Sequence, residues 1–248
     1  MTSQATPSTT RYQRLESARV VATTIRLQRR VEARFPERGI AQVAGELVRV
    51  ATQVAESAST ARHRLKQIRV ASRVLSVVVV VITIVALVLT LRDAVLNGLE
   101  HTFEWLPLIE STVNDVVFAA LAVFFLYALP NRIERSYLLG QLHRLRSLAH
   151  IVDMHQLTKD PERLRPRFTT TPETIDIHLA TSEAMENYLD YCSEMLSLIG
   201  KIAAVCAEES QDSVILDTVS TIETITTGMS SKIWQKISLL PVSANSNR

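Results

Sequence analysis

The chain has 248 residues, a near-neutral formal charge of +2, six glycines and only 5% aromatic residues. Helix-forming residues dominate outside two apolar runs, and alternating apolar segments that end in Asn-Gly or Asp-Gly are nearly absent, which argues against folds that contain a sheet. The arginines are spread along amphipathic segments rather than clustered with aromatic residues, so we expect no nucleic-acid partner. We predict an all-α protein.

The first apolar run, 74–91, holds 18 residues without a charge between Arg73 and Arg92. As a helix it would extend roughly 27 Å, close to the thickness of the hydrocarbon core of a bilayer. A second apolar run lies within 111–131. Aromatic residues near its ends match the belt found at membrane interfaces: Phe103, Trp105 and Tyr127. We therefore predict an integral membrane protein with a two-helix transmembrane hairpin.

Basic residues flank the two spans on one side of the hairpin. They precede the first span and follow the second: Arg62, Arg64, Lys66, Arg69, Arg73, Arg132, Arg135, Arg144 and Arg146. The connecting stretch is acidic, and the positive-inside rule then places both termini in the cytoplasm. Arg outnumbers Lys by 22 to 5, as is common in bacteria with GC-rich genomes. The polar N-terminus lacks the apolar core of a signal peptide, so we expect a bacterial inner membrane.

Positive charge is concentrated toward the N-terminus. Residues 1–73 contain 14 Lys and Arg against 5 Glu, a net +9, whereas residues 133–248 contain 11 against 15 Asp and Glu, a net −4. Two partners fit this basic arm: anionic lipid headgroups, or the acidic C-terminal part of the same chain. The residues expected to contact lipid are those nearest the first span: Arg62, Arg64, Lys66, Arg69 and Arg73.

The remaining segments are predicted to form a cytoplasmic helical bundle. In chain order we expect an N-terminal helical hairpin, a transmembrane helix, a short and partly interfacial external loop, a second transmembrane helix, a cytoplasmic helix, a linker, a C-terminal helical hairpin and a disordered tail: 1–70, 71–91, 92–110, 111–131, 132–158, 159–173, 174–240 and 241–248. The second N-terminal helix, from about Ile40, is expected to run on into the first span. A break at Phe35–Gly39 separates it from the helix before it.

The strongest helical periodicity lies in the C-terminal part. Apolar residues recur at alternating spacings of four and three: Met185, Leu189, Cys192, Leu196, Ile199, Ala203 and Cys206. A second apolar row flanks them, and a face this broad predicts a helix at the centre of a bundle with more than one neighbour. Cys192 and Cys206 would lie roughly 21 Å apart on this helix, too far for a disulfide, and are expected to be small core residues.

One stretch, HIVDMHQLTKD, gathers the candidate catalytic residues His150, Asp153, His155 and Asp160. His150 and Asp153 lie one helical turn apart, but two ligands are too few for a zinc site and His143 is roughly 10.5 Å away, so we expect no metal. We also expect no cofactor, because no nucleotide-binding or redox motif occurs. A polar stripe that faces water or a neighbouring helix explains these residues equally well.

His155 and Asp160 have the spacing of the His-x4-Asp motif of membrane glycerolipid acyltransferases, and the resemblance covers these two residues alone. It implies that His155 acts as a base that Asp160 orients. Those enzymes have α/β folds, whereas this sequence predicts no strands. Asp115 is a different candidate, a possible intramembrane polar site about one turn inside the predicted second span. There the N-terminus of the helix would favour its negative charge.

No motif in the sequence identifies a reaction that the protein catalyses. We therefore expect a non-enzymatic two-span membrane protein that acts through self-association or partner binding, as a sensor, scaffold or effector subunit. The alternatives are an oligomeric pore or membrane-perturbing effector, and a membrane enzyme that uses His150, Asp153 or His155.

Overall fold

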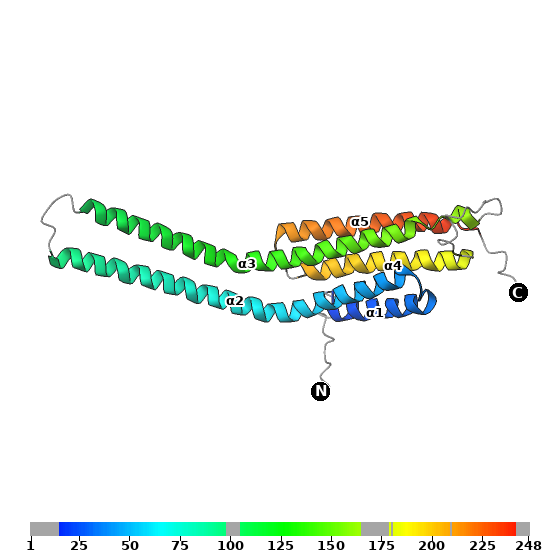
Figure 1. The fold of residues 1–248 in the computed structure, drawn as a ribbon, viewed down its shortest axis with the longest axis horizontal. Helices are drawn as coiled ribbons and strands as arrows, with labels where there is room; N and C mark the ends of the chain where they lie inside the picture. The colour runs from blue at the N-terminus through cyan, green and yellow to red at the C-terminus, as the bar shows by residue number, and fades with distance from the viewer. Residues whose placement is uncertain (1–14, 98–104, 165–178, 180, 209, 242–248) are drawn as a thin grey trace, which may run out of the picture. The chain divides into compact units, whose positions relative to one another are not determined.

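The computed structural model describes residues 15–97, 105–164, 179, 181–208 and 210–241 (Figure 1). These residues form five α-helices and one short 3-10 helix: α1 (Ser17–Arg34), α2 (Gly39–Asn97), α3 (Trp105–Leu157), η2 (Pro161–Leu164), α4 (Ser182–Ala207) and α5 (Ser213–Ser238). No strand occurs in these ranges. The prediction of an all-α fold is confirmed.

The chain divides into two compact units. The first, here called the packed unit, contains Met1–Ala58 and Leu138–Arg248, and the second, the hairpin unit, contains Ser59–Tyr137. The long helices α2 and α3 each contribute residues to both units. The N-terminal helix from Gly39 therefore continues into the apolar run without a break, as the sequence indicated.

The core of the packed unit is centred on α4. Its two apolar rows are buried, and α4 packs against both α5 and α1. Thr181 and Asp212 cap the starts of α4 and α5, because their side-chain oxygens accept hydrogen bonds from Ala184 N at 3.1 Å and Val214 N at 2.9 Å. The periodicity of residues 185–206 thus predicted the buried face of α4 correctly. The neighbours that cover this face come from the same chain.

Both long helices are apolar enough to span a membrane. By length and composition, Gln67–Asp93 and a stretch of Leu108–Leu157 qualify, and the most apolar part of each contains no buried residue. Helix α2 continues to Asn97 and α3 begins at Trp105, so the described ends of the predicted loop 92–110 are helical. Charged side chains such as Arg92 and Asp93 end an apolar run without breaking a helix, which explains the difference.

Five of the predicted segments fall partly outside the described residues. These are the N-terminal hairpin, the external loop, the linker, the C-terminal hairpin and the tail, and the residues concerned are 1–14, 98–104, 165–178, 180, 209 and 242–248. Helix α3 ends at Leu157, just before the linker, and Pro161–Leu164 within the linker form the 3-10 helix η2.

Candidate functional site

The stretch that holds the sequence candidates leads into a polar cluster in the packed unit. We define the polar cluster as Asp153, Gln156, Lys159, Tyr188 and Lys236, which come from the end of α3 and from α4 and α5. Lys236 Nζ donates hydrogen bonds to the backbone carbonyls of Gln156 at 2.9 Å and Lys159 at 3.2 Å. Helix α3 ends at Leu157, where Gln156 O also accepts from Lys159 N at 3.0 Å, and the lysine of α5 adds a charged donor to carbonyls at and just beyond this helix end.

Two further members of the polar cluster are buried. Lys159 is 6% exposed and its Nζ lies 5.3 Å from the centroid of the Tyr188 ring, a cation–π contact. Gln156 is 1% exposed and its Nε2 donates a hydrogen bond of 2.7 Å to Asp153 Oδ1. The cluster therefore joins α3 to α4 and α5 with polar contacts inside the core.

His155 points to a different part of the packed unit. Its imidazole packs against Gly39, the first residue of α2. Burial, and then the positive charge of Lys159, lower the pKa of His155. An adjacent carboxylate would raise that pKa instead. The role that the His-x4-Asp resemblance implies for His155 and Asp160 stays a prediction.

The other candidates differ in exposure. His150 is exposed, together with His143 and Arg146, and Asp153 and Asp160 are half-buried. Across the described ranges no group of three His, Cys, Asp or Glu side chains is placed to hold a metal ion. These positions agree with a polar stripe that faces water and a neighbouring helix.

Asp115 is exposed on α3, but the reason given for its charge was wrong. Helix α3 begins at Trp105, ten residues earlier, rather than near residue 111. Asp115 therefore lies about 15 Å from the helix N-terminus, and the favourable interaction with the dipole is confined to the first turn. A role as an intramembrane polar site stays a prediction.

Ion pairs show where part of the N-terminal positive charge goes. Arg30 Nη1 donates to Glu194 Oε1 at 3.0 Å, and Arg34 Nη2 lies 2.9 Å from Glu183 Oε1. Helix α1 thus packs against acidic residues of α4, one of the two partners that the sequence left open. In the hairpin unit Arg69 lies 3.9 Å from Glu134 and Arg73 is exposed. The side chains of Arg62, Arg64 and Lys66 lie outside the described part.

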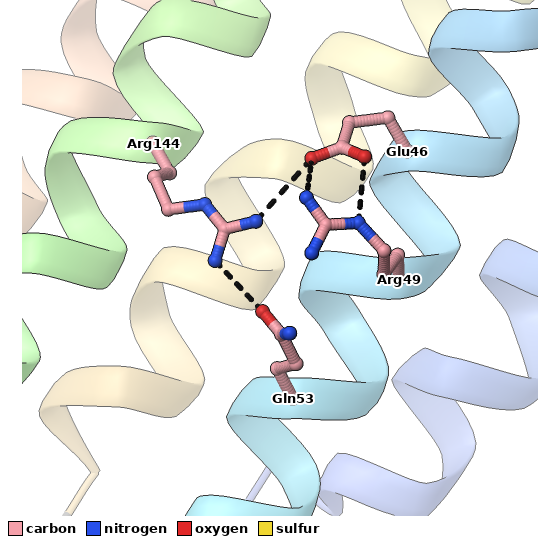
Figure 2. A network of polar contacts seen from close by, with 4 residues as sticks. All are labelled: Glu46, Arg49, Gln53 and Arg144. Carbon is pink, nitrogen blue, oxygen red and sulfur yellow. Dashed lines mark hydrogen bonds and ion pairs between the residues drawn. The ribbon is translucent and has the colours of Figure 1, made fainter.

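A second polar network links α2 to α3 in the packed unit (Figure 2). Arg144 of α3 donates to Gln53 Oε1 at 2.7 Å and reaches Glu46 Oε1 at 3.3 Å. Arg49 Nε donates to the other oxygen of Glu46 at 2.7 Å. Hydrogen bonding from Arg49, with a smaller contribution from Arg144, lowers the pKa of Glu46. This network orients the polar faces of two helices that are far apart in the sequence.

The most constrained polar residues were not among the sequence candidates. Lys159 stood in the predicted linker, and neither Lys236 nor Tyr188 was predicted as a site residue. Lys236 stands near the end of the predicted hairpin 174–240, where nothing in the sequence signals that a lysine caps another helix. Both cysteines are free and buried, and burial raises the pKa of each thiol to about 12, which suits core residues.

The polar cluster holds the end of α3 against α4 and α5, and the Glu46 network holds α2 against α3. No family model, curated protein or solved structure matches the chain.

Proposed function

We propose that the chain is a two-span protein of the bacterial inner membrane whose packed unit is a non-enzymatic cytoplasmic module. It acts through self-association or through binding a protein partner. The observation that supports the proposal most is the surface of the hairpin unit, which is apolar and exposed along both helices. Exposed residues from both helices include Val77, Ile84, Leu91, Phe118 and Phe124.

Lipid accounts for this surface better than water does. Removing one such side chain from water contributes about 1.5–3 kcal/mol, and the hairpin unit carries many of them. A helical hairpin also satisfies its backbone hydrogen bonds internally, as a bilayer requires. The basic residues before Arg73 and after Pro130 then favour a cytoplasmic packed unit, with Arg62–Arg73 near anionic headgroups.

The internal contacts of the packed unit exclude one association surface. The apolar face of α4 is covered within the chain, so self-association or partner binding uses another surface of the packed unit. The proposal is therefore a folded module on a membrane anchor.

A labelling experiment tests the topology. Cysteines introduced at the exposed positions Val95 and Ser220 are treated with a membrane-impermeant maleimide in intact cells and in lysed cells. We expect Val95→Cys to react in intact cells and Ser220→Cys to react only after lysis. The buried native thiols serve as the internal blank. Equal labelling of both positions in intact cells would contradict the topology.

Crosslinking in native membranes tests the association. A discrete band that contains two or more copies, or one partner in a fixed ratio, is expected. A protein that stays monomeric and alone, both in membranes and after reconstitution, would count against the proposal.

The exposed carboxylate of Asp115 favours a second candidate, an oligomeric pore or membrane-perturbing effector. An ionisable group on an apolar helix face favours contact with another copy or with a water-filled path. Purified protein in liposomes would then pass ions, and Asp115→Ala would abolish the flux. Absence of flux from the reconstituted oligomer would exclude this function.

A further inference from the structure

In the packed unit, the imidazole of His155 lies against Gly39, the first residue of α2. A Cβ atom built on Gly39 would lie 2.6 Å from His155 Cε1 and 3.3 Å from Nε2. Real Cβ atoms essentially never approach a heavy atom so closely. Only glycine at position 39 therefore lets the imidazole rest against the first residue of α2.

The His155 ring packs against the turn between α1 and α2. We call this turn, residues 35–39, the corner. Phe35 closes α1 and packs edge-on against Tyr188, with ring centroids 5.4 Å apart. Ile40, just beyond the corner, is fully buried. The corner is thus fastened to the core on both sides of Gly39, and His155 covers it from α3.

Charged groups of both signs lie on the elements around the imidazole. The N-terminus of α2 is the positive end of a helix dipole, and Lys159 stands four residues after His155, just beyond the end of α3. The other charged groups are Glu37 and Arg38 of the corner, Asp153 of α3, Asp160 just after α3, and Lys236 of α5. Among them Lys159 lowers the pKa of His155, after the larger effect of burial.

We propose that His155 is an acid-sensitive latch, in which the neutral imidazole holds the α1–α2 corner on α3 and the imidazolium releases it. A second positive charge beside Lys159 and the α2 N-terminus is unfavourable, and the proposed release separates the corner from the ring against the contacts that Phe35 and Ile40 make with the core. Release exposes Phe35 and the apolar start of α2. The latch lies wholly in the packed unit, so it does not depend on membrane insertion.

The direction of the pH effect follows from linkage. The pKa of His155 is lower in the folded chain than in the unfolded one. The contact therefore stabilises the corner fully above the unfolded pKa of about 6.5, and this stabilisation is lost as the pH falls toward the folded pKa.

Hydrogen exchange of the full-length protein in detergent tests the latch. Peptides that cover residues 35–42 are compared at pH 7.5 and 5.5, after correction for the intrinsic rate of amide exchange. We expect several-fold faster exchange at pH 5.5 in the wild type and no such change in His155→Gln, whose side chain stays neutral. The matched control His150→Gln, at an exposed position, keeps the wild-type response. Equal protection of the wild type at both pH values would overturn the proposal.

Two measurements cover the case in which His155→Gln folds poorly. Gly39→Ala forces the ring away, so its corner exchanges fast at both pH values with a reduced difference between them. An NMR titration of the six histidines in the wild type needs no variant of His155. It should show one imidazole that titrates below the ordinary range, and six ordinary titrations would refute the latch.

Discussion

The hydroxyl of Ser72 in α2 donates a hydrogen bond to the backbone carbonyl of Leu126 in α3. Four residues after Leu126 stands Pro130, which has no N–H, so this carbonyl has lost its donor within the helix. Ser72 replaces the missing donor from the neighbouring helix. Ser72 and Pro130 are the buried residues among those described in the hairpin unit, so the two helices pack most closely at this level.

The first prediction is that the cost of losing Ser72 depends on Pro130. Ser72→Ala leaves the Leu126 carbonyl without a donor and should destabilise the hairpin by about 1 kcal/mol, whereas in a Pro130→Ala background the restored N–H should make the same change nearly neutral. Unfolding free energies in micelles give the double-mutant cycle. Ser76→Ala is the control, because its hydroxyl bonds to Ser72 O at 2.9 Å within the same helix. An equal cost in both backgrounds would show that the carbonyl is not the reason.

The second prediction concerns the cap that α5 provides for α3. Lys236→Met keeps the apolar part of the side chain. It removes both hydrogen bonds that Lys236 Nζ donates to the backbone carbonyls of Gln156 and Lys159. Since hydrogen bonds to charged groups contribute about 1.5–3 kcal/mol, we expect a loss of that order in urea unfolding. Lys232→Met, at an exposed position of the same helix, should change stability little. A similar small effect at both positions would refute the cap.

The third prediction is an acid-dependent loss of stability through Glu46. Its pKa is lowered in the folded protein by Arg49 and Arg144, so its contribution is present above the unfolded pKa and disappears as the pH falls through the folded value. Urea unfolding between pH 6 and pH 3 should show a shallower pH dependence for Glu46→Gln than for the wild type. Glu56→Gln, at an exposed position of the same helix, serves as the comparison. Parallel curves for wild type and Glu46→Gln would contradict this reading of Figure 2.

The fourth prediction is that both native thiols are unreactive while the protein is folded. Burial raises the pKa of Cys192 and Cys206 to about 12, and the thiolate is the reactive form. At pH 8 a thiol reagent such as DTNB should label neither residue until denaturant is added. An introduced Ser220→Cys, at an exposed position, should react at once. Rapid labelling of the native protein would mean that α4 separates from its neighbours.

The local pattern of apolar residues was enough to predict the helices and to show that the helix over Met185 to Cys206 is covered on several sides. The spacing of Met185 to Cys206 identified the central helix, because a helix that is apolar over a broad face must be covered on several sides. The uncharged run 74–91 identified a helix able to span a bilayer from length and hydropathy alone. The exact extent of α2 and α3 did not follow, because charged residues such as Arg92 change hydropathy without ending a helix.

The sequence alone was enough to predict the all-α class, the two apolar helices long enough to cross a membrane, and the broad buried face of α4. Each of these features depends on residues that are close together in the chain. Only the tertiary structure decided that Lys236 caps α3, that His155 rests on Gly39 and that Ser72 replaces the donor lost at Pro130. These contacts depend on which helix faces meet and at what register, and no spacing within one segment encodes that. The uncharged run thus indicated a membrane, and the packing of distant residues showed where this protein is held together.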